Sequence, residues 1–317
     1  MATAFGTNAW LGFGEESTYG TAVSPTKYIE ITEDNLQGKQ SLIAIPTLRS
    51  PSQNQRTYSK KSVEGSFKCS LGYSGFERLL KHALGTVATT GPTSSVYTHT
   101  FSLATALPTG LTLHVNRDSA ALGGNSAFEY RGCQITKMSL RCAPEQILEA
   151  EFEVIGQDWG NVAVATPTFP SFEAIDWTHL ITCTFSSTSV NVKELEFVLE
   201  NNLASDRYKL GTRLRQGRGR NGPRKVTLKV TTEFDSLTQY QWFMNQTDRS
   251  AVITFSNGAS GSALRVFSIN ATCNAQGDDP SVSDSGPIML TLNFEAFDYT
   301  SSNTESSIVI QNASNPI

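Results

Sequence analysis

The chain has 317 residues, which is enough for one large domain or two domains of ordinary size. Only 17% of the residues are charged and the formal net charge is −4, which excludes a generally basic nucleic-acid-binding protein. Hydrophobic residues make up 38%, while Ser, Thr, Asn and Gln are plentiful. This balance is typical of all-β proteins, whose strand faces carry Thr and Ser more often than Lys and Glu.

The cysteines and the N-terminal residues indicate the compartment in which the chain folds. The cysteines are odd in number and no pair has CxxC spacing: Cys69, Cys133, Cys142, Cys183 and Cys273. Residues 1–14 lack the basic and apolar regions of a signal peptide, and no apolar run approaches the length of a membrane span. We therefore expect reduced, mostly buried cysteines in a protein that folds in a cytosol.

The first half of the chain contains strand patterns and one clear helix. Residues 27–36 read as a strand that ends in an acidic residue, Asn and Leu. Residues 63–73 alternate, with Phe67, Cys69 and Leu71 on one side. Residues 74–85 then carry apolar residues on one helical face. Ser74 and Glu77 have the spacing of a capping box, and Gly85 stands where a helix C-terminus favours glycine.

The second half repeats this order of elements. Residues 192–203 read as a strand with a similar end, and residues 225–234 alternate, with Val226, Leu228 and Val230 on one side. A second helix is predicted over residues 235–245. Asp235 is its expected cap, and its expected inner face is formed by Leu237, Tyr240 and Met244.

The shared order predicts an internal duplication. Strands at 128–142 and 147–159 have counterparts at 264–273 and 287–299, and Phe152-Glu153 matches Phe294-Glu295. The predicted fold is mainly β, with two tandem domains at residues 1–160 and 161–317. Each domain would contain antiparallel β sheets, forming a sandwich or a barrel segment, with one flanking α-helix and one long loop.

Both long loops are basic and lack acidic residues. Six basic residues lie within residues 213–225, and removing six positive charges would take the net charge from −4 to −10. The loop at residues 49–61 is its counterpart in the first half. Read alone, such segments suggest phosphate binding, but a duplicated loop favours the docking of a repeated partner. The candidate contact residues are Arg49, Arg56, Lys60, Lys61, Arg213, Arg215, Arg218, Arg220, Arg224 and Lys225.

The sequence resembles the major tail tube proteins of bacteriophages with long, non-contractile tails. The resemblance lies in residues 12–31, in the loop, strand and helix of residues 48–85, and in the hairpin and strand of residues 128–156. It implies a structural virion protein, not an enzyme, with no cofactor. Such subunits close into rings with an inner β-barrel, and a long loop of each domain reaches the next ring. The stacked rings form a hollow tube through which viral DNA passes.

The resemblance also implies partners and a copy number. Family rings usually contain six tube domains, so a chain with two domains would form a trimer with pseudo-sixfold symmetry. Other expected partners are further tail proteins, such as the tape measure and the tail terminator. Viral DNA would cross the lumen without specific binding. We expect the protein in the virion tail, assembled in the host cytoplasm and without contact to a membrane.

Acidic residues recur on single faces of the predicted strands. On residues 149–154, three Glu alternate with Ala, Phe and Val. If the polar faces line the lumen, an acidic wall would repel phosphate and let DNA slide. An ordinary solvated sheet face is the alternative interpretation. The candidate lumen residues are Glu30, Glu149, Glu151, Glu153, Glu196 and Glu295.

No pattern predicts a catalytic, metal or cofactor site. The four histidines lie far apart, and none has metal-ligand spacing with another His or Cys. The acidic residues within 276–286 suggest calcium, but their spacing is not that of an EF-hand, and a solvated hairpin loop is the simpler interpretation.

Two other functions remain open at this point. One is a nucleic-acid-binding protein that uses the basic loops at 49–61 and 213–225. The other is a β-sandwich carbohydrate-binding module, which would need exposed aromatic residues on one sheet face. The strand patterns do not show such residues.

Overall fold

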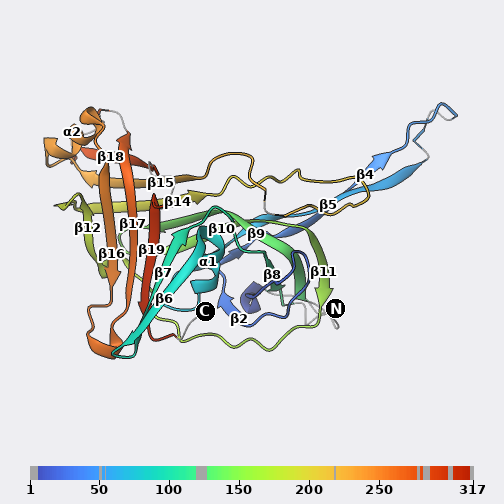
Figure 1. Cartoon of the computed structure of the whole chain (residues 1–317), viewed down its shortest axis with the longest axis horizontal. Helices are drawn as coiled ribbons and strands as arrows, with labels where there is room; N and C mark the ends of the chain where they lie inside the picture. The colour runs from blue at the N-terminus through green and yellow to red at the C-terminus, as the bar shows by residue number, and fades with distance from the viewer. Residues whose placement is uncertain are drawn as a thin grey trace.

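The computed structural model describes residues 6–49, 52–53, 55–118, 127–217, 219–276, 279–280, 286–298 and 303–314. These residues contain nineteen β-strands and two α-helices, so the chain is mainly β, as its composition predicts. All strand pairs are antiparallel, and the sheet that they form is not closed into a barrel (Figure 1).

The first half contains eleven strands and helix α1. In chain order its elements are β1 (Trp10–Glu15), β2 (Lys27–Glu30), β3 (Glu33–Asp34), β4 (Gln37–Ala44), β5 (Arg56–Ser70), α1 (Glu77–Leu84), β6 (Gly85–Thr93), β7 (Val96–Leu103), β8 (Leu111–Asn116), β9 (Ala127–Cys142), β10 (Glu149–Gly156) and β11 (Asp158–Val162). A short 3-10 turn, Gly6–Asn8, precedes β1.

The second half contains eight strands and helix α2. In chain order its elements are β12 (Leu180–Phe185), β13 (Thr188–Ser189), β14 (Val192–Glu200), β15 (Lys225–Glu233), α2 (Leu237–Asn245), β16 (Arg249–Ser256), β17 (Val266–Gln276), β18 (Met289–Ala296) and β19 (Ser306–Asn312). Two 3-10 turns, Trp177–His179 and Gly261–Ala263, precede β12 and β17.

One run of strands passes through both halves without interruption. β3 and β4 pair with β5, which pairs with β10, and β10 pairs with β9. β9 then pairs with β14 of the second half, followed by β15, β18 and the end of β17. We call this run of strands the main sheet. The β9–β14 pair therefore joins the halves through backbone hydrogen bonds.

The described strands of the two halves pair in the same order. In the first half β10 lies between β5 and β9, and in the second half β18 lies between β15 and β17. The N-terminal part of β9 pairs with β8 and β11, while the matching part of β17 pairs with β16 and β19. In addition, the β6–β7 hairpin attaches to β19, so the halves are tied together at a second place.

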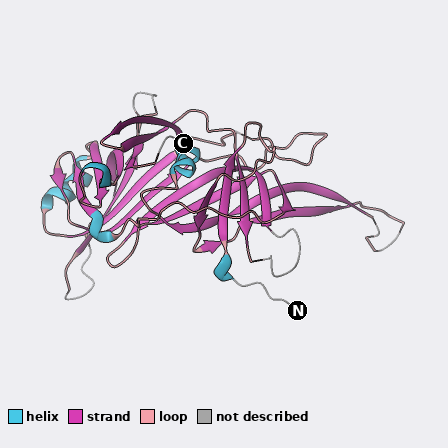
Figure 2. Cartoon of the chain, turned by 90° about the horizontal axis from the view of Figure 1, so that it is seen from below, coloured by secondary structure: helices cyan, strands magenta, loops and turns pink. Residues whose placement is uncertain are grey.

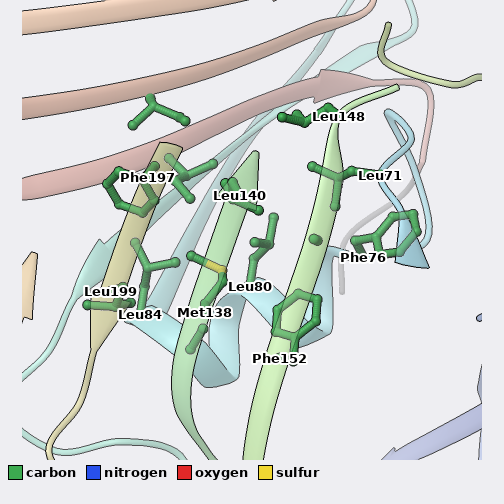
Figure 3. Packing of buried hydrophobic residues seen from close by; sticks show 14 of the residues in the cluster. Leu71, Phe76, Leu80, Leu84, Met138, Leu140, Leu148, Phe152, Phe197 and Leu199 are labelled. Atoms are coloured by element: carbon green, nitrogen blue, oxygen red, sulfur yellow. The ribbon is translucent and has the colours of Figure 1, made fainter. Parts of the chain in front are cut away.

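The core lies against one face of the main sheet. Phe67 and Cys69 are buried on β5, as is Leu71 directly after it, and Val226, Leu228 and Val230 are buried on β15, as the alternation predicts. Helix α1 lies across the β9–β14 junction. Its Leu80 and Leu84 belong to the same buried cluster as Met138 of β9 and Leu199 of β14 (Figure 3). Burial of these apolar surfaces supplies the main driving force for joining the halves.

Helix α1 begins differently from the sequence prediction. Its N-cap is Phe76, and no side chain caps it. Instead, the Ser74 hydroxyl donates to the Ser171 carbonyl at 3.0 Å, and the Glu77 carboxylate accepts from the Gly75 N–H at 2.9 Å. The predicted capping box is therefore wrong. Gly85 does end the helix, with a φ of 131° that favours glycine.

Helix α2 turns a different face to the core than predicted. Ser236, not Asp235, caps it by accepting a hydrogen bond from the Thr238 N–H. Its buried residues are Gln239 and Trp242, and the Trp242 ring packs 5.5 Å from that of Phe185. Burial of the large indole against the core fixes the rotation of the helix. The predicted inner residues Leu237 and Met244 are consequently exposed.

A long arm projects from the sheet. It is the hairpin of β4 and the first part of β5, and it extends well beyond the rest of the chain (Figures 1 and 2). Residues 49–61 were expected to form a flexible loop. β5 already begins at Arg56, however, so much of this segment is paired strand.

Candidate functional site

The polar face of the main sheet opposes the buried core. On β10, Ala150, Phe152 and Val154 are buried, whereas Glu149, Glu151 and Glu153 point to the other side. Because successive side chains of a strand alternate between faces, this strand presents a row of three carboxylates. The sequence predicted this separation.

Neighbouring strands present opposite charges on this face. β5 contributes Lys68, and β9 contributes Lys137 and Arg141, on either side of the acidic row of β10. Across the junction, acidic β14 lies between β9 and basic β15, which is followed by acidic β18. The acidic residues on this face include Glu33, Glu149, Glu151, Glu153, Glu194, Glu196, Glu200, Glu233 and Glu295. The basic residues are Lys68, Lys137, Arg141, Lys225 and Lys229. The acidic rows were predicted from the sequence, whereas the basic rows were not, because they become apparent only when the strands are placed side by side in register.

Ion pairs link these rows, and four of them join residues named above. Their N–O distances are 2.6 Å for Lys68–Glu33, 3.3 Å for Lys137–Glu153, 2.7 Å for Arg141–Glu196 and 3.9 Å for Lys225–Glu295. The hydrogen bond to Glu33 raises the pKa of Lys68. All four pairs are solvent-exposed to some degree, so each contributes at most about 1 kcal/mol to stability. The face is thus a lattice of alternating charges in which the acidic residues are in excess.

The structure brings together five of the six predicted lumen residues. Glu149, Glu151, Glu153, Glu196 and Glu295 all lie on the polar face. Glu30 does not. It lies on β2, which pairs with β1 away from the main sheet, opposite Trp10. Two hollows of about 350 and 430 Å³ lie on the polar face beside β14 and β15.

The arm exposes both apolar and basic side chains. Exposed fractions are 49% for Leu42, 52% for Ile43 and 107% for Leu48, and the neighbouring Ile45 and Tyr58 are also exposed. Arg49 and Arg56 are exposed on the same arm. A projecting hairpin with exposed apolar groups is a surface that other protein chains can bind.

The second basic loop does not extend into solvent but runs along the arm. The Lys61 N–H donates to the Arg213 carbonyl at 3.0 Å, and the Tyr208 hydroxyl donates to the Lys61 carbonyl at 3.0 Å. The Arg213 guanidinium lies over the Tyr58 ring, and the Lys60 ammonium lies over the Tyr208 ring. Residues 208–213 therefore pack against the β5 side of the arm, and we call the arm together with these residues the composite arm.

Arg215 is buried inside the chain. Its side chain is 1% exposed and donates to the Ala204 carbonyl at 3.1 Å, the Tyr19 hydroxyl at 2.7 Å and the Gln134 side chain at 3.2 Å. Burial lowers the pKa of Arg215 and raises that of Tyr19. The expectation that Arg215 contacts another ring is corrected, because its guanidinium already ties the second half to the first.

Arg224 and Arg220 also bind within the chain. Arg224 donates to the Ala104 carbonyl at 2.6 Å and pairs with Glu305 at 3.2 Å, and its side chain is 5% exposed. Arg220 donates to the same carbonyl at 3.3 Å. Arg224 is therefore a second internal tie rather than a free contact residue. The predicted contact at Arg218 lies outside the described residues, and Lys225 lies on the polar face beside Glu295.

Each histidine has a hydrogen-bonding partner in the chain. His82 lies 3.1 Å from Glu15, His114 lies 3.1 Å from Glu129, His99 lies between Thr89 and Asn312, and His179 lies 3.2 Å from Tyr73. Among the described residues, no three His, Cys, Asp or Glu side chains gather closely enough to hold a metal ion. No helix in the described part of the chain is long and apolar enough to span a membrane.

A projecting arm and sheet edges that have no second strand partner among the described residues are features to which other chains can bind. The family model described as phage tail tube protein matches residues 6–296, nearly the whole chain, so the chain belongs to the phage tail tube protein family. No curated protein matches the chain. Family membership implies a structural role in the phage particle rather than an enzymatic one.

Proposed function

We propose that this chain is the subunit of a hollow tail tube, which assembles in the host cytoplasm and carries viral DNA during ejection. The observation that carries the proposal is the main sheet, with one buried face, one polar face and a free edge at each end. β3 and β4 pair only with β5, and residues 274–276 of β17 pair only with β18, among the described strands. Free edges of this kind are templates for pairing with another chain.

In this proposal the two halves act as two tandem tube domains, residues 1–160 and 161–317, and three chains close one ring. The matching order of strand pairing in the halves supports this reading. The free β17 edge of one chain would pair with the free β3–β4 edge of the next, as β9 pairs with β14 within the chain. Closed rings need the same rotation at each step, and two similar domains provide it.

The polar face would line the lumen. The acidic residues on it outnumber the basic ones, which opposes phosphate binding, while the alternating rows keep the wall soluble and internally balanced. DNA would then pass without fixed counter-charges at most positions.

The composite arm would bridge successive rings. Exposed Leu48, Arg49 and Arg56 are available for this contact, whereas Arg215 and Arg224 are used within the chain. Charge on the arm would steer association more than it adds affinity. The tape measure and tail terminator proteins would contact the same tube, in its lumen and at its end.

Electron microscopy of the concentrated, purified protein tests this function. We expect hollow, stacked tubes. A protein that forms neither rings nor tubes, and instead shifts duplex DNA in a salt-sensitive manner, would support the nucleic-acid-binding alternative and contradict the proposal.

A further inference from the structure

Helix α2 presents an apolar face with two exposed ends, while the half-buried Tyr240 between them donates its hydroxyl to Asp279 at 2.6 Å. Leu237 is 64% exposed and Met244 is 61% exposed. The two residues are seven positions apart, which places them on one helical face, with Tyr240 between them. Large apolar side chains gathered on one face of a short helix mark a contact surface.

In the first half the corresponding positions, one at the N-cap of α1 and two within it, are buried. Phe67 of β5 faces Phe152, and Leu228 of β15 faces Phe294, so β15 corresponds to β5 with an offset of 161 positions. The same offset carries the buried residues Phe76, Leu79 and Ala83 of the first half onto the α2 face: they are 3%, 0% and 0% exposed and correspond to Leu237, Tyr240 and Met244.

The burial of α1 depends partly on the second half. α1 lies across the junction at which β14 fills the edge of β9 (Figure 3). The amide of Asn201, which follows β14, donates to the carbonyl of Ala83 in α1 at 2.8 Å. The chain directly after β14 thus contacts α1 from the second half.

Among the described strands, none fills the matching edge beside helix α2. The helix lies beside β17, and residues 274–276 of that strand pair with β18 but with no second described strand on the edge that β14 fills in β9. The Asn274 amide donates to the Gln246 carbonyl at the end of α2, so the helix and this free edge are adjacent. The exposed apolar face and the free edge therefore lie next to each other. In the first half the corresponding place is the β9–β14 junction, and we use the word seam for such a junction between neighbouring sheet segments.

We propose that Leu237, Tyr240 and Met244 cover the seam between two copies of this chain, by packing on the first-half edge strands of a neighbouring copy. This inference rests on the proposed tube function and adds the side chains that hold a ring together. Helix α2 would thus contact a neighbouring chain within the same ring, whereas the arm would contact the next ring.

Glutamate substitutions on α2 of the full-length chain test this contact. Leu237→Glu and Met244→Glu place a charge on the proposed seam, so we expect folded subunits with unchanged melting temperature that form at least tenfold fewer closed rings. Ile181→Glu, at a position 62% exposed on β12, is the matched control and is expected to assemble normally. Normal rings from both α2 variants would overturn the inference, as would an equal loss in the control.

Labelling gives a second test that does not depend on how well the charged variants fold. All five native cysteines are buried, so a thiol at Met244→Cys dominates reaction with a maleimide. We expect labelling at least tenfold slower in assembled tubes than in free subunits. Equal rates in both states would overturn the seam contact while leaving tube formation intact. Failure of the wild-type chain to form rings would instead contradict the proposed function itself.

Discussion

Arg141 on β9 and Glu196 on β14 form an ion pair at 2.7 Å across the junction between the two halves. The Arg141 side chain is 60% exposed, so this pair contributes little to stability. Beneath it, Leu140 and Phe197 face each other in register and are fully buried. The junction is therefore held by backbone pairing and apolar burial, while the charged pair shapes the polar face.

Replacing the buried Arg215 is expected to destabilise the folded chain. Arg215→Ala would leave the Gln134 side chain, the Tyr19 hydroxyl and the Ala204 carbonyl without this partner in a buried site. We expect a loss of about 2–4 kcal/mol in the free energy of unfolding. The matched control is Arg213→Ala, at an exposed position, with an expected change below about 1 kcal/mol. Urea denaturation measures both, and equal effects would show that Arg215 is not a structural tie.

The arm is expected to stack rings without contributing to ring closure. Leu48→Glu places a charge on the most exposed apolar residue of the arm, which touches little of its own chain. We expect a folded subunit that forms rings but not long tubes, as seen by electron microscopy. Normal tube lengths would contradict a stacking role for this residue.

Charge on the polar face should affect DNA passage rather than assembly. In the Glu149→Lys and Glu151→Lys double variant, new cations would line the proposed lumen and hold phosphates. We expect intact tails and slower DNA ejection from phage particles. Glu30→Lys has the same charge change per residue away from this face and is expected to eject normally. Equal slowing by both substitutions would contradict the assignment of the lumen.

The low pKa of Glu15 leads us to expect that the folded state loses stability at acidic pH. It accepts hydrogen bonds at 3.1 Å from His82 and at 2.8 Å from Lys81, and these contacts, His82 first, lower the pKa of Glu15 to about 2. A depressed carboxyl pKa stabilises the fold above the unfolded value of 4.5, and this contribution is lost as the pH falls toward 2. Burial lowers the pKa of His82, so its protonation also disfavours the fold at low pH.

Glu15→Gln should therefore cost about 1–3 kcal/mol at neutral pH and progressively less as the pH falls from 4.5 to 2. Denaturant unfolding at a series of pH values measures the difference between the variant and the wild type. Glu30→Gln, at an exposed position, serves as the control. A difference that stays constant over this range would contradict the role of the Glu15 carboxylate.

The sequence predicts local features well because these depend on neighbouring positions. The alternation on β10 and β15 identified their buried and polar faces, since side-chain direction in a strand has a period of two. The ends of both helices were close to prediction, and Gly85 ends α1 as predicted, whereas both N-caps differ from the prediction. Caps depend on the approach angle of the chain, as the Ser74 bond to Ser171 illustrates.

Features that depend on distant residues could not be predicted. The burial of Arg215 requires Tyr19 and Gln134, which lie 196 and 81 positions away. The basic rows emerge only when strands are placed in register. The arm was taken for a loop because β4 is exposed on both faces and so lacks an apolar alternation. The predicted inner face of α2 is indeed apolar. The helix nevertheless turns another side to the core, because burial of Trp242 fixes its rotation.

The in-plane symmetry of an assembled tube tests the central claim most directly. Cross-sections from electron cryomicroscopy are expected to show threefold symmetry, with six similar segments in each ring and two types of seam. One seam would correspond to the β9–β14 junction within a chain and the other to the contact between chains. Strict sixfold symmetry with six full-length chains in a ring would mean that each chain supplies one barrel segment, which would contradict the account.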